Sequence, residues 1–339
     1  MTSTEATIQL GHGGGGRLSQ QLLQELLIPA FGPDDGVLHD AALLASPGHT
    51  LAFTTDSYVV RPLFFPGGNI GELAVFGSVN DLAMTGARPV ALSLGLILEE
   101  GLELTSLRRV IEAIRTAADR CHVKVITGDT KVVERGKGDG LFINTSGIGV
   151  VEHELRIHPS SVQPGDVVLV SGDLGRHGTA ILVAREELGF RCDLQSDLAP
   201  LHETVQELIM AGLKLHCLRD LTRGGLATAI DEIARAAGYT IELEEEAVPL
   251  QPEVRSACEL LGLDPLAMAN EGRMLVICPA SEADTTMALL QQHNPSATRV
   301  GAVTHELGTM QRQQVVVRNR LGVLRPLDLG RGEQLPRIC

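Results

Sequence analysis

The residues best suited to chemistry include a cysteine at the end of the chain. Cys339 closes the segment Gln334-Leu335-Pro336-Arg337-Ile338-Cys339. No residue follows to crowd the thiol, and a fully extended chain from Pro326 reaches up to about 45 Å. The sulfur can therefore be presented to one active site and then to another. A chain can also end on a cysteine by accident, but a prenylation site is excluded, because that motif carries further residues after its cysteine.

Acidic residues beside apolar runs are candidates for holding a cation. Asp40 and Asp56 each stand at one end of such a run. Carboxylates at strand ends are common metal ligands and are also common in plain turns. Residues 69–84 are predicted to form a helix that begins after Asn69 and is apolar on all sides. Such a helix is buried, so Asp81 needs a partner, which we expect to be a cation rather than a lone buried salt bridge.

A polar group follows the short β-branched strand predicted at 123–127. It consists of Gly128, Asp129, Thr130 and Lys131 in succession. The acid can hold a metal ion, and the lysine can stabilise charge on a phosphoryl group. The alternative is an ordinary polar turn.

Further candidates lie in the second half of the chain. Asp220 stands between two arginines at the entry to a helix predicted at 226–237, and Glu271 lies three residues before the start of an apolar strand predicted at 274–278. His177 lies in a loop between a strand and a helix, where the backbone amides could meet an anion. The histidine itself is as compatible with a turn residue as with a ligand.

Four consecutive glycines, Gly13, Gly14, Gly15 and Gly16, follow His12 near the start of the chain. Glycines let backbone amides approach phosphate oxygens with no side chain in the way. The run is either a loop that orders on its ligand or a flexible linker. It lacks the Lys-Ser/Thr ending of a P-loop, so a Walker-type site is not supported.

Composition limits the class of protein. The formal net charge of −14 and the 3% aromatic content disfavour nucleic-acid binding. No apolar run is long enough to span a bilayer, and the polar, acidic N-terminus does not resemble a signal peptide, so we expect a cytoplasmic protein. The six cysteines form no CxxC pair. This pattern argues against a structural zinc site and a disulfide framework.

The length of the chain and the elements that position these residues suggest two domains. A chain of 339 residues favours two domains. An amphipathic helix is predicted at 105–121 and a strand at 141–151. The segment 157–166, rich in Pro, Ser and Gly, marks the boundary between the two domains. We therefore expect domains at 1–155 and 156–325, followed by a flexible tail at 326–339 that carries Cys339.

The order of these motifs resembles the HypE family of [NiFe]-hydrogenase maturation proteins over nearly the whole chain. In looser form the internal motifs are shared with aminoimidazole ribonucleotide synthetase (PurM), selenophosphate synthetase and thiamine-monophosphate kinase. The motifs that carry the resemblance are the glycine run, Thr-Thr-Asp-Ser, Ser-Val-Asn-Asp-Leu-Ala-Met-Thr-Gly-Ala, Gly-Asp-Thr-Lys-Val-Val, Arg-Asp-Leu-Thr-Arg-Gly-Gly-Leu-Ala, Asn-Glu-Gly-Arg and the terminal Pro-Arg-Ile-Cys. The terminal motif singles out HypE. One departure is His39, because several sister families carry two adjacent acids there.

The resemblance implies an ATP-dependent dehydration. In this family a partner, HypF, places a carbamoyl group on the terminal cysteine, and HypE converts the S-carboxamide to an S-cyanate. The cyanide then passes to iron on the HypC–HypD complex. The resemblance also implies a two-domain α/β fold of the PurM type, in which the first domain pairs with its twin in a homodimer and the nucleotide lies near that interface.

The resemblance further implies roles for individual residues. Cys339 would carry the substrate group, Glu271 would act as the base, and Lys131 would stabilise charge. Mg²⁺ would be held by Asp40, Asp56, Asp81 and Asp220. Contacts to ATP would come from Gly13, Gly14, Gly15, Gly16, Asn80, Asp129 and Thr130.

Two other functions are compatible with the sequence. One is a sister-family phosphotransferase that acts on a free small molecule, although no nucleophilic cysteine accompanies the glycine run as selenide chemistry would favour. This function predicts that removing the tail leaves catalysis intact. The other is a non-catalytic carrier whose thiol ferries a group or a metal, for which ATP is irrelevant.

Overall fold

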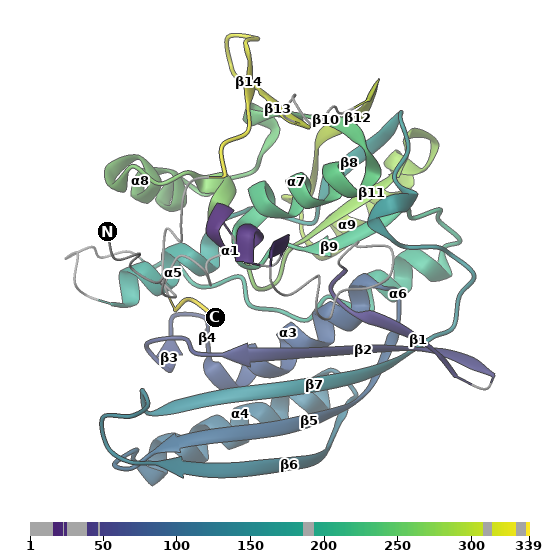
Figure 1. The fold of residues 1–339 in the computed structure, drawn as a ribbon. Helices are drawn as coiled ribbons and strands as arrows, with labels where there is room; N and C mark the ends of the chain where they lie inside the picture. The colour runs from purple at the N-terminus through teal and green to yellow at the C-terminus, as the bar shows by residue number, and fades with distance from the viewer. Residues whose placement is uncertain are drawn as a thin grey trace, which may run out of the picture.

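The computed structural model describes residues 16–22, 24–25, 39–46, 48–185, 193–307, 314–329 and 337–339. Two β-sheets organise this part of the chain (Figure 1). The first lies below α3 and the second above it in the view. Residues 152–165 connect them, because the first sheet ends at Val151 and the second begins at Asp166.

The first sheet has five strands in the order β1-β2-β7-β5-β6. Neighbouring strands are antiparallel except for the parallel pair β5 and β6. The strands are β1 (Ala42–Ser46), β2 (His49–Tyr58), β5 (Arg88–Glu99), β6 (Lys124–Val133) and β7 (Leu141–Val151). The crossover from β5 to β6 contains helix α4 (Leu104–Arg120), as a parallel connection requires.

Helix α3 (Ile70–Met84) packs on the inner face of this sheet beside α4. The Asn69 side chain caps it by accepting from the backbone N–H groups of Gly71 and Glu72. Thirteen of its fifteen residues are buried, so the predicted all-round apolar helix is confirmed. Its surroundings come from both halves of the chain, because the same apolar cluster includes Ile181 and Met268.

The second sheet has seven strands in the order β14-β13-β10-β12-β8-β11-β9. Only β10 and β13 pair in parallel. The strands are β8 (Asp166–Val170), β9 (Cys217–Asp220), β10 (Tyr239–Glu244), β11 (Met274–Pro279), β12 (Thr298–Leu307), β13 (Val315–Arg318) and β14 (Leu324–Pro326).

Helices cover both faces of the second sheet, which explains the continuous apolar runs of its central strands. Val168 and Val170 of β8 join the cluster around α7 (Gly225–Ala237). Val167 and Leu169 face the opposite cluster, which includes α6 (His202–Met210) and α9 (Ala283–His293). The other elements named in the described part of the chain are α1 (Arg17–Leu22), α5 (Arg176–Ala184), α8 (Pro252–Leu261), the short pair β3 (Phe64–Phe65) and β4 (Gly68–Asn69), and 3₁₀ turns at Pro159–Ser161, Glu245–Ala247, Pro265–Ala267 and Ala280–Glu282.

The prediction that the strand ends at residue 127 and is followed by a separate polar group is wrong, because β6 continues to Val133. Gly128 and Lys131 pair with Leu94 and Ile97 of β5, so long-range strand pairing overrides the local turn signal. A Cβ atom on Gly128 would lie 2.3 Å from the Leu94 carbonyl oxygen. Glycine is therefore needed here for close approach of two strands rather than for a turn. No helix among the described residues is long and apolar enough to cross a membrane.

Candidate active site

Three carboxylates meet where α3 passes between the two sheets. Asp81 comes from α3, Asp40 lies two residues before β1, and Asp220 ends β9. One oxygen from each lies within 4.8 Å of the others, which is the spacing of ligands around a single cation. These are three of the four residues predicted to hold metal, and they converge from segments far apart in the sequence.

The fourth predicted ligand, Asp56, lies beside this acid cluster of Asp40, Asp81 and Asp220. It lies on β2, where the Tyr58 hydroxyl donates to its Oδ2 at 3.0 Å. Its charge contributes to raising the pKa of Asp81. Asp56 and Asp81 thus share one electrostatic site.

Burial and mutual repulsion dominate the electrostatics of the site. Desolvation, followed by the charge of Asp56, raises the pKa of Asp81 well above its ordinary value. Burial and then Asp40 do the same for Asp220. Burial raises the pKa of Asp40 to about 6, although Arg219 opposes the shift. Carboxylates crowded in this way need positive charge in order to ionise, so the donor set suits a divalent oxygen-binding ion such as Mg²⁺.

Two contacts hold the cluster in place. The Thr54 hydroxyl donates to Asp81 Oδ2 at 2.6 Å. Arg219 Nε lies 2.9 Å from Asp40 Oδ1, and the same guanidinium also pairs with Glu232. Oδ2 of Asp40 has no hydrogen-bond partner despite its burial. The cluster therefore keeps a free oxygen for a ligand.

Glu271 lies close to the same charges in the second half of the chain. Its side chain is 3% exposed, and its Oε1 is buried without a hydrogen-bond partner. Burial, followed by Asp220, raises its pKa well above the ordinary value. A carboxylate in this environment is a strong proton acceptor once it is ionised, which suits a general base.

Asn80, predicted to contact nucleotide, has its amide engaged between the two halves. Its Nδ2 donates to the Ala199 carbonyl at 3.1 Å, and its Oδ1 accepts from the Leu201 N–H at 2.8 Å. A longer contact of 3.5 Å joins Nδ2 to the Glu271 carbonyl. In this structure Asn80 supports the backbone around Glu271.

Asp129, Thr130 and Lys131 do not join the acid cluster within one chain. Asp56, Thr145, Leu94 and Gly128 occupy one row across the sheet, so β6 is three strand spacings, about 14 Å, from β2. Asp129 and Lys131 pair with Gly95 and with the exposed Ile97, and therefore point to the outer face. There Lys131 forms an ion pair with Asp129 at 2.9 Å.

Of the glycine run, Gly13, Gly14 and Gly15 lie outside the described residues. Gly16 is described, and its carbonyl accepts from the Gln20 N–H in α1 at 3.1 Å. The tail residues 330–336 also lie outside the description. Its last three residues are docked, with a main-chain oxygen of Cys339 accepting from the Val59 N–H at 3.1 Å. Cys339 is half-buried. Because it binds Val59, it lies just beyond the end of β2, the strand that carries Asp56.

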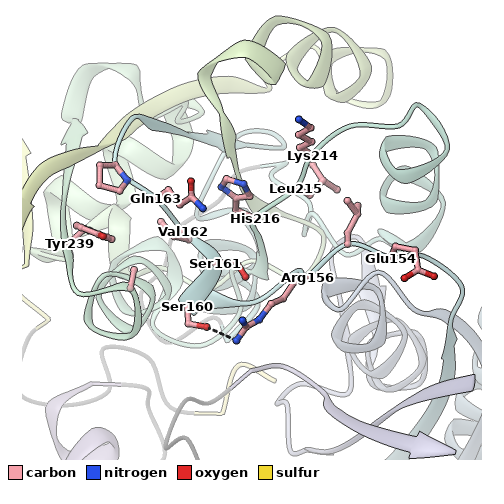
Figure 2. A pocket seen from close by; sticks show the side chains of 13 residues that line it. Glu154, Arg156, Ser160, Ser161, Val162, Gln163, Lys214, Leu215, His216 and Tyr239 are labelled. Carbon is pink, nitrogen blue, oxygen red and sulfur yellow. Dashed lines mark hydrogen bonds between the residues drawn. The ribbon is translucent and has the colours of Figure 1, made fainter.

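A pocket of about 950 Å³ opens elsewhere, beside the segment that connects the sheets (Figure 2). Arg156, Lys214 and His216 line it, and Arg156 donates to the Ser160 hydroxyl at 3.4 Å. No residue of the acid cluster lines this pocket, and neither Glu271 nor Cys339 does.

Two family models match the chain. The N-terminal domain of AIR synthase related proteins matches residues 38–151, and the corresponding C-terminal domain matches residues 163–310. Carbamoyl dehydratase HypE of Cupriavidus necator is 47% identical over 338 residues, which cover 98% of this chain and 95% of that protein. The chain belongs to the HypE family.

Solved HypE structures share the fold over nearly their whole length. A HypE structure in complex with ATP has a TM-score of 0.82 and 46% identity, and the match covers 98% of this chain and 100% of that one. A structure of a HypE–HypF complex gives a TM-score of 0.84 and 40% identity, with 91% and 99% covered. The predicted two-domain α/β fold of the PurM superfamily is confirmed.

Two arginines at the site of this HypE family member were not predicted from the sequence as site residues. Arg219 neutralises Asp40, and the charge of Arg223 lowers the pKa values of Asp56, Asp220 and Glu271 against the effect of burial. Both flank Asp220 in the motif Arg-Asp-Leu-Thr-Arg. The available signal was that an acid and two bases share one strand-to-helix connection.

His39, at the departure from the sister families, adds no charge to the site. Burial lowers its pKa to about 3, so the ring is neutral. It stacks on His158 with the ring centroids 5.8 Å apart. A neutral packed ring thus adjoins Asp40, and it supplies no carboxylate to the acid cluster.

Proposed function

We propose that the chain is an ATP-dependent carbamoyl dehydratase that serves [NiFe]-hydrogenase maturation. Its substrate is the S-carboxamide on its own Cys339, and its products are an S-cyanate, ADP and phosphate. Full-length membership of the HypE family carries this proposal. The terminal cysteine docked beyond the strand that bears Asp56 supports it.

The reaction needs a better leaving group than an amide oxygen. ATP supplies a phosphoryl group that lets this oxygen depart as phosphate. The chain's own task is to hold the tail, exclude water and remove protons from the amide nitrogen. Glu271 is the proposed proton acceptor, because it is buried, carries an unpartnered Oε1 and has a raised pKa.

Mg²⁺ would be held by Asp40, Asp56, Asp81 and Asp220. The unpartnered Oδ2 of Asp40 and the close spacing of three of these acids fit such an ion. Bound magnesium would neutralise the charge of the triphosphate next to this acidic protein. Gly13, Gly14, Gly15 and Gly16 would close over the phosphates, with Thr130 as a further nucleotide contact.

We infer that the working form is a homodimer. α3 and α4 cover one face of the five-stranded sheet and leave the other open (Figure 1). The open face carries Phe53, Ile97 and Ile148, which are 40%, 44% and 40% exposed. Lys131 and Asp129 point to this same face. A twin that packs there would receive Lys131 at its own site, which explains why the residue lies away from Glu271 of its own chain.

The partners and the division of the chain follow from the same proposal. HypF would deliver the carbamoyl group, and the HypC–HypD complex would accept the cyanide, all in the cytoplasm. Residues 1–155 would bind ATP and dimerise, residues 156–325 would supply Glu271 and Asp220, and residues 326–339 would carry Cys339 between enzymes.

The decisive experiment is the mass of the C-terminal peptide after carbamoylation by HypF, with and without ATP. We expect the loss of one water only when ATP is present, and no modification in a Cys339→Ala variant that remains folded. A carbamoyl group that persists while ATP is hydrolysed would favour a phosphotransferase acting on a free substrate. Absence of any modification would favour a carrier.

A further inference from the structure

The docked end of the chain is held through its backbone. Main-chain oxygens of all three terminal residues accept hydrogen bonds from the body of the protein. The bonds are Arg185 Nη2 to the Arg337 oxygen at 2.7 Å, the Arg61 N–H to the same oxygen at 3.3 Å, His177 Nε2 to the Ile338 oxygen at 2.6 Å and the Val59 N–H to the Cys339 oxygen at 3.1 Å. The thiol takes part in none of these four bonds.

One helix supplies both side chains among these donors. His177 lies in the first turn of α5, and Arg185 is its C-cap residue. Eight positions correspond to a rise of about 12 Å along the helix. Arg185 Nε also donates to the Arg61 carbonyl at 3.1 Å. Helix α5 therefore fastens the tail to the segment that follows β2.

The chemistry at His177 fixes its tautomer. A carbonyl oxygen only accepts, so Nε2 carries the proton that reaches Ile338. Burial lowers the pKa of His177, so the ring is neutral, and its Nδ1 accepts from the Ser196 hydroxyl at 2.8 Å. Both ring nitrogens are thereby used, at a position with no solvent exposure.

Side chains of the tail add further contacts at the site where residues 337–339 dock, which we call the seat. Ile338 is 6% exposed and belongs to the apolar cluster that also contains α3. Arg337 adopts a left-handed backbone with φ of 59° and forms an ion pair with Asp139. A non-glycine residue holds this conformation only when its surroundings favour it.

The seat and the proposed base rest on the same loop. Ser196, which binds His177, is followed by Asp197, whose Oδ1 accepts from the Glu271 N–H at 3.2 Å. The Ala199 N–H donates to the Glu271 carbonyl at 3.4 Å. A displacement of the seat would therefore move the support of Glu271 as well.

We propose that His177 and Arg185 form a clamp that positions the terminal tripeptide by its backbone carbonyls, with Ser196 tying the clamp to the loop that supports Glu271. Both are positioning residues, because they act on the reacting group through the tail. The four bonds join main-chain oxygens of the tail to the body of the protein, so the clamp acts through the backbone that carries the reacting group.

The clamp is tested by the rate at which iodoacetamide alkylates Cys339, measured on the C-terminal peptide by mass spectrometry. Loss of one neutral hydrogen bond shifts the docked fraction by roughly 3- to 10-fold. We expect His177→Ala to accelerate alkylation by that factor. Arg185→Ala removes charge-assisted bonds to the Arg337 and Arg61 carbonyls, so it should accelerate alkylation by at least that factor. His177→Gln retains an N–H donor, so it restores part of the protection. Arg156→Ala, which removes an arginine from the separate pocket of Figure 2, leaves the rate unchanged.

Thermal unfolding of each variant shows whether the chain is folded. If His177→Ala fails to fold, Arg185→Ala and His177→Gln still decide the matter. Wild-type alkylation rates in Arg185→Ala and in a folded histidine variant would overturn the clamp.

A second readout rests on the proposed function and separates it from the clamp. Each variant is carbamoylated on Cys339, and dehydration is followed in a single turnover after ATP is added. We expect Ser196→Ala to slow dehydration more than it accelerates alkylation, because it loosens the loop beneath Glu271. Faster alkylation in the clamp variants, together with no dehydration even in the wild-type protein, would retain the clamp and refute the proposed function.

Discussion

At the scale of single residues, Glu271 shows how burial prepares a carboxylate for proton transfer. Replacing it with glutamine keeps the shape and removes the basic oxygen. We expect Glu271→Gln to bind ATP normally and to slow dehydration by roughly 100- to 10,000-fold. Nucleotide titration and single-turnover mass spectrometry measure the two effects. Normal turnover in this variant would remove Glu271 from the mechanism.

The acid cluster also makes a prediction about pH. The folded-state pKa of Asp40 is about 6, raised from 3.8, and those of Asp81 and Asp220 are also raised well above their ordinary value. Each of these carboxyl groups has a higher pKa in the folded protein than in the unfolded chain. Its contribution to the free energy of unfolding is therefore fully present below the unfolded-state pKa and is lost as pH rises through the folded-state pKa. Mg²⁺ would offset the loss, so we expect the increase in melting temperature on adding Mg²⁺ to grow from about pH 5 to about pH 8.

Buried histidines such as His39 and His177 titrate in the opposite sense, because burial lowers their pKa values. Their contribution is the same with and without Mg²⁺, so the difference between the two melting curves isolates the carboxylates. A difference that is flat or shrinks with rising pH would contradict a divalent ion at this site.

At the scale of elements, α3 determines how the site is assembled. Its helical period and its cap were readable from the sequence, and Asp81 was identified because a helix apolar on all sides leaves no solvent for a charge. The full length of strand β6 could not be predicted from the sequence. Gly128 and Asp129 favour a turn locally, and only the length of β5 beside them keeps the strand extended.

Helix α3 gives a direct test through Asp81→Asn. The amide oxygen can still accept from the Thr54 hydroxyl, so the local bond is kept. Removing one of several mutually repelling charges should stabilise the Mg²⁺-free protein by about 1–3 kcal/mol near neutral pH. The same change should abolish most of the stabilisation by Mg²⁺. Asp284→Asn, an exposed change in the first turn of α9, is the matched control and should alter neither quantity.

At the scale of the whole molecule, the sequence alone left the meeting of the two halves unknown. The two sheets follow from strand patterns and the family resemblance, whereas the convergence of Asp40, Asp81 and Asp220 needs α3 to contact both halves. The tail gave no periodicity from which a docked position could be derived. Its seat depends on His177 and Arg185, which lie more than 150 positions away from it in the sequence.

The placement of Lys131 on the open sheet face leads to a prediction about two copies of the chain. In a homodimer that shares residues, one site would use Glu271 of one chain and Lys131 of its twin. Lys131→Ala and Glu271→Gln should each be inactive alone. Co-expressed with different N-terminal tags and purified through both, the hybrid should regain about half of the wild-type dehydration, because one of its two sites is intact.

Hybrids of each variant with the wild-type chain provide the matched controls, and each should also keep about one intact site. If Lys131 acted on Glu271 within its own chain, the hybrid of the two variants would have no intact site and would remain inactive. A hybrid without activity, beside active controls, would therefore reject the shared site and leave the outer position of β6 to be explained by dimer contacts alone.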